Sequence, residues 1–338
     1  MFAAGRENFC LMDLQLPISM TSLPRPIRYG DKVLLVGSCF TEHIGGALGD
    51  WKFETLQNPN GILFDPASVA SGLGSYISPE RYVAEDLFFA NDLWQSWKHH
   101  GIFSGVDRDA VLQAINASQQ RAHAFLQEAD WLIVTLGSSF SYRLVEDGRP
   151  VANCHRMPQQ LFRKHLMTIE ETVTALDVCL HRLFYFNPRV HVLFTVSPVR
   201  HIRDGIVENN RSKARLIESV HHLVNKFDRL WYFPAYELVI DVLRDYRFYD
   251  IDMVHPNYTA TQFVLEHFTQ YCIDATSRSV LEQVKQLVAA RRHRPRHPST
   301  AAHAKFRREH YEKAAELARR YPFLRLDEEL LYFSAEPC

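Results

Sequence analysis

The stretch KVLLVGSCFTEHIGGALGDW, residues 32–51, predicts a buried strand that turns directly into a helix. Four apolar residues, 33–36, form a run of strand length that ends at Gly37. Ser38 and Cys39 follow the glycine, and a helical pattern begins after them. We expect the glycine to allow a sharp turn, which would present two potential nucleophiles at the end of a strand.

Strand-like runs continue to alternate with helical patterns along the chain. The further strand candidates are residues 51–56, 131–136, 191–196 and 230–233. Helical apolar spacing occupies residues 109–129, 168–186 and 212–228. Thr168 and Glu171 form a capping box at the start of the second of these helices. Strands separated by helices predict an α/β fold with a parallel, doubly wound sheet of about five strands, covered on both faces.

Length and composition are those of an ordinary globular protein. The 338 residues suggest one large domain with an appendage, or two domains. Hydrophobic residues make up 46% and charged residues 23% of the chain. Because the formal net charge is -1, bulk charge does not steer the protein toward nucleic acid or acidic membranes.

Targeting signals and cysteine spacing predict a cytoplasmic protein without a membrane partner. No apolar run approaches the ~20 residues of a membrane span. The first 20 residues lack the basic start and long apolar stretch of a signal peptide. The six cysteines are scattered without C-x-x-C spacing, which favours free thiols over disulfides or a zinc site.

The composition changes beyond about Ser277, where residues 291–320 hold ten Lys or Arg against three Glu. We therefore expect an N-terminal extension (1–30), a main domain (31–276) and a basic, mostly helical C-terminal appendage (277–338). A solvated helical appendage is one interpretation, and an arm that binds phosphate, nucleic acid or a partner complex is the other. Aromatic residues for base stacking are sparse there, so we do not expect a nucleic-acid partner.

Polar residues follow the predicted strands, where ligands bind in open α/β sheets. The loops after the five strands begin Gly37-Ser38-Cys39, Asn58-Pro59-Asn60-Gly61, Gly137-Ser138-Ser139, Ser197-Pro198 and Pro234-Ala235. Asp252 and His255 lie further on, three residues apart and just before a predicted helix. That spacing lets the carboxylate accept the imidazole Nδ1–H and leaves Nε2 to take a proton from a hydroxyl such as that of Ser38. The alternatives to a catalytic role are that Ser38 only caps the following helix and that the spacing of Asp252 and His255 arises by chance.

These residues resemble a known family. The segments GSCFTEHIG, NPNGILFDP, VTLGSSFSY, VANCH, TVSPVRHIRDG, NNRSKARL and DIDMVHPN are similar, in order and spacing, to those of the GSCFA-domain family, a bacterial relative of the SGNH (GDSL-like) hydrolases. The match covers roughly residues 30–270, although Thr41 replaces the final alanine of the name-giving motif. The resemblance implies a flavodoxin-like three-layer sandwich with Ser38 as nucleophile, His255 as general base and Asp252 as the partner that orients it.

The resemblance also implies an oxyanion site, with one departure. Gly61 stands where SGNH enzymes use a backbone amide, and Gly137 begins the segment in which they have Gly-x-Asn-Asp. Ser139 occupies the position of the oxyanion Asn, so the side-chain donor is in question. The candidates that would replace it are Asn60, Asn153 and His155.

Other polar residues are candidates for substrate binding, and each also has a purely structural interpretation. Asn153 and His155 share a face of an extended segment, or His155 is a satisfied residue of a hairpin. Arg200 would clamp a substrate carboxylate or phosphate, or pair with Asp204. Lys213, like Asn210, would complete the pocket or cap a surface helix.

Cys39 competes with Ser38 as nucleophile. A helix N-terminus lowers the pKa of a thiol, and a thiolate is the better nucleophile. Consecutive residues at a strand–helix turn point in different directions, however. If Ser38 faces the cleft, we expect Cys39 to face the core, where cysteine is common.

The sequence thus predicts a serine ester hydrolase or acyltransferase that works through an acyl-Ser38 intermediate. It requires no cofactor and no metal, and its substrate would be a small-molecule or saccharide ester. A non-catalytic binding module that keeps the fold and cleft is the alternative. The oligomeric state, the acyl group and the acceptor are left open.

Overall fold

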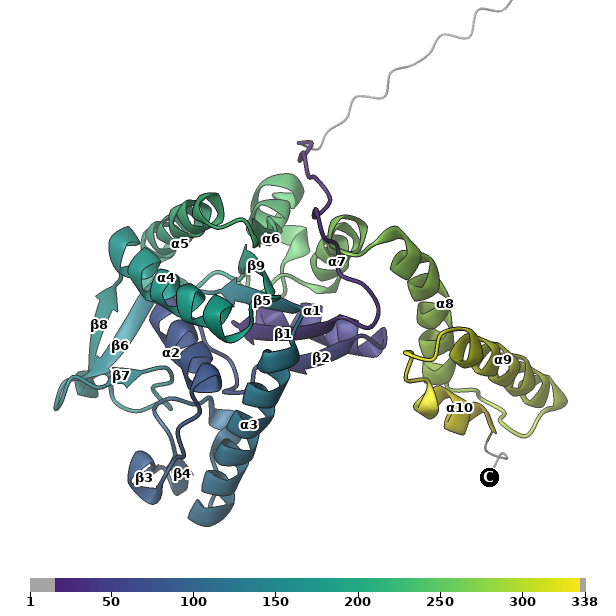
Figure 1. The fold of residues 1–338 in the computed structure, drawn as a ribbon, viewed down its shortest axis with the longest axis horizontal. Coiled ribbons are helices and arrows are strands. Elements are labelled where there is room, and N and C mark those ends of the chain that lie inside the picture. The colour runs from purple at the N-terminus through teal and green to yellow at the C-terminus, as the bar shows by residue number, and fades with distance from the viewer. Residues whose placement is uncertain (1–15, 335–338) are drawn as a thin grey trace, which may run out of the picture.

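The computed structural model describes residues 16–334 and is built on a five-stranded parallel sheet (Figure 1). Its strands are β1 (Lys32–Gly37), β2 (Glu54–Gln57), β5 (Trp131–Leu136), β9 (His191–Val196) and β10 (Leu230–Tyr232). They lie in the order β2-β1-β5-β9-β10, and every neighbouring pair is parallel. This is the doubly wound order of flavodoxin, so the predicted fold class is confirmed.

Helices cover both faces of the sheet in three layers (Figure 1). One face packs against α2 (Pro66–Ile77), α3 (Arg108–Glu128), α4 (Ile169–Phe186) and α5 (Ile206–Lys226). The other face packs against α1 (Phe40–Asp50), α6 (Ala235–Glu237), a π-helical turn (Leu238–Leu243) and α7 (Tyr258–Cys272). The capping box predicted at Thr168 and Glu171 begins α4.

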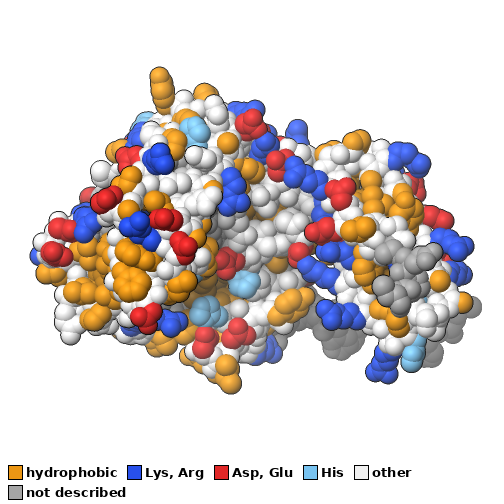
Figure 2. Space-filling view, turned by 90° about the horizontal axis from the view of Figure 1, so that it is seen from below, with side chains coloured by type: hydrophobic (Ala, Val, Ile, Leu, Met, Phe, Trp, Pro, Cys, Tyr) orange, Lys and Arg blue, Asp and Glu red, His pale blue; other side chains and the backbone are white. Residues whose placement is uncertain are grey.

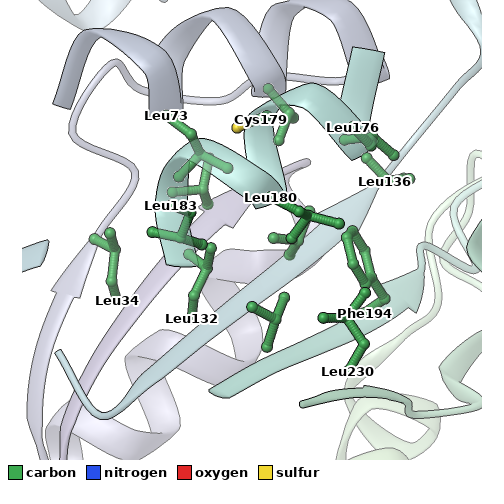
Figure 3. Close-up of a cluster of buried hydrophobic side chains, with 14 of the residues drawn as sticks. Leu34, Leu73, Leu132, Leu136, Leu176, Cys179, Leu180, Leu183, Phe194 and Leu230 are labelled. Carbon is green, nitrogen blue, oxygen red and sulfur yellow. The ribbon is translucent and has the colours of Figure 1, made fainter. Parts of the chain in front are cut away.

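Alternation along the buried strands sends successive side chains to opposite layers. Leu34, Leu132 and Phe194 of the strands point toward α2 and α4. There they pack against Leu73 of α2 and against Leu180 and Leu183 of α4 (Figure 3). Their strand neighbours, such as Leu35 and Ile133, belong to the core on the α1 and α7 side. Because both faces are buried, these strands are continuous apolar runs, which is why they were recognisable in the sequence.

Short antiparallel pieces extend beyond the sandwich. A hairpin joins β3 (Phe88–Ala90) to β4 (Leu93–Gln95), and a three-stranded sheet combines β6 (Phe140–Leu144), β7 (Pro150–Val151) and β8 (Phe162–Leu166). Single 3₁₀ turns lie at 84–86, 101–103, 159–161, 202–204 and 246–248. None of the helices between residues 16 and 334 is long and apolar enough to cross a membrane.

The C-terminal region is helical, as predicted, and as far as residue 334 it contributes no strand to the sheet. It consists of α8 (Ala275–Arg292), α9 (Ala301–Arg320) and α10 (Asp327–Ser334), which share a small core of their own. Glu329 is fully buried and pairs with Lys52 of the sandwich and with Arg291, at 3.0 Å in each case. The domain boundary expected at residue 277 falls inside α8.

The segment before β1 is held by the far end of the sandwich. The N–H of Ile27 donates to the carbonyl of Cys272 at 2.8 Å, and the Ile27 side chain is fully buried. Tyr29 stacks on Phe53 with ring centroids 4.2 Å apart, and its N–H donates to the Ser277 hydroxyl. The first 30 residues thus include a packed segment, and residues 1–15 of the expected extension lie outside the described part of the chain.

Gly37 is required where β1 ends. Its φ is +145°, and a Cβ built on it would lie 2.1 Å from the carbonyl oxygen of Thr135 on β5. No other residue fits this approach without moving the strands apart. The glycine therefore places the next residue, Ser38, at the carboxyl ends of the neighbouring strands β1 and β5.

Candidate active site

Ser38 lies at the topological switch point of the sheet. The chain leaves β1 in one direction toward β2 and later continues from β5 in the other, so the carboxyl ends of β1 and β5 border a crevice. A Cβ built on Gly137, directly after β5, would lie 3.1 Å from the Cβ of Ser38. The glycine leaves room for the serine, and the two loops that sequence analysis singled out do meet.

The Ser38 side chain is enclosed. Its exposed fraction is 0%, and its Oγ accepts a hydrogen bond from the Phe40 N–H at 3.3 Å. Phe64 Cδ1 and His201 Nε2 lie 3.1 and 3.4 Å from the same Cβ position on Gly137. Both rings are half-buried and meet edge to face, with centroids 5.4 Å apart. A substrate therefore has to move a neighbouring side chain to reach the hydroxyl.

Asp252 and His255 form the pair that their spacing predicted. The His255 Nδ1 lies 2.6 Å from Asp252 Oδ2, and the Val254 and His255 N–H groups donate to Oδ1 at 2.9 and 3.0 Å. The backbone and side-chain hydrogen bonds from His255, followed by that from Val254, lower the pKa of Asp252 to about 2. The carboxylate is therefore ionised at neutral pH and orients the ring with Nε2 free of the pair.

The loop that carries His255 lies against the loop that carries His201. The Arg200 N–H donates to the Val254 carbonyl at 3.2 Å. Burial, Lys213 and His255 together lower the pKa of His201 to about 3. Within residues 16–334 no hydrogen bond joins Ser38 to His255, so their meeting in one cleft stays a prediction.

The backbone amides expected to bind an oxyanion are already engaged. The Ser38 N–H donates to the Thr135 carbonyl at 3.0 Å, and the Gly61 N–H donates to the Asn58 carbonyl at 2.7 Å. The first bond joins the end of β1 to β5, and the second closes a turn within the loop after β2, so both N–H groups are used inside the protein.

The expected side-chain donors are engaged as well. Ser139 is buried, and its hydroxyl donates to the Ser212 carbonyl at 3.1 Å. Asn60 is buried, accepts from the Tyr76 hydroxyl and Gln119, and donates to the Lys98 carbonyl. These contacts tie the two loops to the helices behind them.

Asn153 and His155 are used for local structure. The Asn153 side chain accepts from the His155 N–H at 2.8 Å, which supports a left-handed turn at His155. The His155 Nε2 lies 2.8 Å from the Ser96 carbonyl, and its ring contacts Trp97. This is the arrangement of a satisfied histidine, the plainer of the two alternatives.

Arg200 is half-buried beside the site and does not pair with Asp204. The Asp204 carboxylate contacts Lys164, and among the described residues the Arg200 guanidinium donates only to the Asn210 side chain, at 3.4 Å. Asn209 holds the same loop by accepting the His201 N–H at 2.9 Å. The guanidinium therefore has donors left for a bound anion.

Cys39 is a poor nucleophile in this environment. It is partly buried, and burial followed by the charge of Glu42 raises the pKa of its thiol. The thiol is therefore protonated at neutral pH, although it lies at the start of α1. Burial outweighs the helix terminus here.

Lys213 is buried beside the site and holds two of its loops together. It is 1% exposed, and its Nζ donates to the carbonyls of Gly137 and Ser197 at 2.6 Å each, which join the loops after β5 and β9. No carboxylate accompanies it among the described residues, and burial lowers its pKa to about 7. A neutral amine has two N–H donors, and two carbonyls accept them. The surface-cap interpretation of Lys213 is wrong.

Lys213 should make the stability of the protein rise with pH. An unfolded lysine keeps its proton to pH ~10.4, whereas the folded one releases it near pH 7. Unfolding therefore takes up a proton between these values, and raising the pH disfavours unfolding. Relative to Lys213→Met, the wild type should gain up to about 3 kcal/mol between pH 7.5 and 9.5 at ~1.4 kcal/mol per unit. Urea unfolding of both proteins measures this, and parallel curves would contradict it.

A polar groove lies between the loop that carries His255 and the C-terminal helix α8. It measures about 760 Å³ and is lined by Glu42 and His43 of α1, Asp250 and Pro256 beside His255, Tyr258 of α7, and Lys285 and Arg292 of α8. Figure 2 shows the surface hollowed between the sandwich and the C-terminal helices, with acidic and basic side chains at the junction. Residues 16–334 contain no group of three or more His, Cys, Asp or Glu that could hold a metal ion.

Fold and site together describe a doubly wound α/β sandwich with a buried serine at its switch point and an Asp–His pair in a neighbouring loop. Residues 32–268 match the GSCFA family, and residues 284–336 match the C-terminal domain of GSCFA domain proteins. The chain belongs to the GSCFA family. A search of curated protein sequences found no match.

Two solved structures are remotely similar. One is a carbohydrate esterase family 3 from Talaromyces cellulolyticus, with 10% identity, a TM-score of 0.35, and coverage of 76% of this chain and 99% of that one. The other is an acetyl xylan esterase from the rumen bacterium Butyrivibrio proteoclasticus, with 11% identity, a TM-score of 0.33, and coverage of 73% and 64%. At this level of similarity neither structure indicates what this chain does.

Proposed function

We propose that this protein is a serine ester hydrolase or acyltransferase with Ser38 as nucleophile and His255 as general base. The observation that supports this most is the Asp252–His255 contact of 2.6 Å, made by a carboxylate that two backbone N–H groups also hold. An imidazole fixed in this way donates from Nδ1 and keeps Nε2 as a base. His201 is the nearer ring to Gly137, but its pKa of about 3 makes it a weak base at neutral pH.

The reaction would pass through two transfers of the same acyl group. In the first, Ser38 Oγ bonds to the ester carbonyl carbon while its proton passes to His255 Nε2, and the leaving alcohol then takes that proton. In the second, water or an acceptor hydroxyl gives its proton to Nε2 and attacks the acyl-serine. The bond from the acyl carbon to Ser38 Oγ then breaks, and Nε2 returns the proton to that oxygen. The polar groove beside His255 supports a polar acceptor, such as that of a small-molecule or saccharide ester.

Labelling by a fluorophosphonate tests this proposal. The reagent reacts with an activated serine, so we expect the wild-type protein to gain one phosphonyl group at Ser38, located by peptide mass spectrometry. Denatured protein is the control and should stay unlabelled. A folded protein that never labels, or that labels only on Cys39, would overturn the assignment.

A non-catalytic binding module is the second candidate, and two observations favour it. Ser38 has no exposed surface, and the Ser38 and Gly61 amides are both engaged within the protein. Such a module would bind a ligand in the cleft without forming an acyl-serine. Failure to label, combined with binding of an ester analogue that is lost in Arg200→Ala, would support it.

A further inference from the structure

Asn58, whose side chain holds the residue before Ser38, carries a buried amide nitrogen that has no partner in the described part of the chain. The residue follows β2 in a left-handed conformation, with φ +44°, and is 7% exposed. Its N–H donates to the Leu35 carbonyl of β1 at 2.8 Å, which fixes the loop against the strand that ends at Gly37. Asn58 thus lies on the β2 side of Ser38, opposite Gly137 on the β5 side.

The orientation of the Asn58 amide is fixed by chemistry. The Gly37 N–H donates to Oδ1 at 2.9 Å, and only the oxygen of the amide can accept it. Nδ2 therefore occupies the other corner of the amide. Within residues 16–334 it has no hydrogen-bond partner, and no other buried side-chain amide nitrogen shares this state.

Such a donor is costly in a resting protein. A buried polar group without a partner destabilises the fold, and native proteins contain few of them. Asn60, two residues on, satisfies both of its amide atoms. A structural role therefore explains why Asn58 has an amide oxygen at this position, but it does not explain why its amide nitrogen is buried without a partner.

We propose that Asn58 is a catalytic residue whose Nδ2 donates a hydrogen bond to the oxyanion formed when Ser38 attacks an ester. The proposal rests on the proposed function. The donor is preorganised, because its amide is held through Oδ1 by the residue that precedes the nucleophile. It also supplies the side-chain donor that Ser139 does not provide, from the opposite side of Ser38.

Asn58→Asp tests the donor most directly. Aspartate keeps the oxygen that accepts from Gly37 and tolerates the left-handed conformation, but it has no N–H. We expect kcat for p-nitrophenyl acetate to fall about 10²–10³-fold, the usual effect of losing one oxyanion donor, with KM little changed. Asn58→Gly removes the donor without adding a charge and should show a loss of the same order.

Asn116→Asp is the matched control. Asn116 lies on α3, and its amide donates to the carbonyls of Tyr82 and Leu112. The substitution removes two structural hydrogen bonds, so thermal stability should fall while kcat stays at the wild-type value. Circular dichroism verifies that each variant is folded.

The outcomes separate the two proposals. If the wild type labels at Ser38 and both Asn58 variants label at the wild-type rate, Asn58 has no catalytic role and the serine assignment stands. If Asn58→Asp loses activity but Asn58→Gly does not, the added charge is responsible and the donor role is overturned. If the wild type itself fails to label, the proposed function falls first.

Discussion

Replacing Ser38 by alanine is expected to abolish fluorophosphonate labelling and to lower ester hydrolysis at least about 10³-fold, to the background rate. The substitution removes the oxygen that would bond to the acyl carbon, and no neighbouring group replaces it, because the raised pKa of Cys39 keeps that thiol protonated. The hydroxyl makes one long contact, at 3.3 Å to the Phe40 N–H, so the fold should lose no more than about 1 kcal/mol.

Intact-protein mass spectrometry and a thermal melt measure both effects on one sample. Cys39→Ala is the matched control, since it removes the adjacent side chain and should keep most of the labelling. Equal labelling of the wild type and Ser38→Ala would end the serine assignment. Loss of labelling in Cys39→Ala alone would move the nucleophile by one residue.

His255→Ala is expected to lower the labelling rate about 10²–10⁴-fold, the usual contribution of a positioned general base. The variant should fold normally, because the side chain is about half exposed and its only described side-chain contact is with Asp252. Asp252→Asn should have a smaller effect, since the imidazole remains and only its orientation and charge partner change. Rates measured under pseudo-first-order conditions distinguish the three proteins.

Two further histidine variants sharpen this test. His222→Ala changes an exposed residue of α5 and should label like the wild type. His201→Phe keeps a ring against Phe64 and removes the imidazole that lies beside Gly137 and Ser38. If His201→Phe loses labelling and His255→Ala does not, the base is His201 and the present assignment is wrong.

The sheet was predictable because its signals are local. Each buried strand is a short apolar run, and Thr168 with Glu171 marks the start of α4. Three of the antiparallel strands, β3, β4 and β7, were not predicted, since they have two or three residues each and leave no periodic pattern.

In the candidate site too, the features set by local spacing were predictable and those set by the tertiary fold were not. The Asp252–His255 contact spans three residues, so spacing alone predicted it. The burial of Lys213 depends on α5 beginning at Ile206 and on where the loops after β5 and β9 end, which no spacing encodes. Asn58 and Asn60 stand together in one polar loop of the sequence, and of the two only Asn60 was a candidate donor. The structure separates them, because the Gly37 N–H occupies only the oxygen of the Asn58 amide, whereas both amide atoms of Asn60 have partners.

The packing of the segment before β1 has a consequence for how the protein is made. Tyr29 donates to Ser277, 248 positions later, and Ile27 pairs with Ile273 at the end of α7. A ribosome adds ~5–20 residues per second, so the apolar side chains of this segment wait tens of seconds for their partners. The segment can dock only after α7 has left the ribosome, because Leu23 and Ile27 donate to the carbonyls of Tyr271 and Cys272, and until then the nascent chain exposes their side chains.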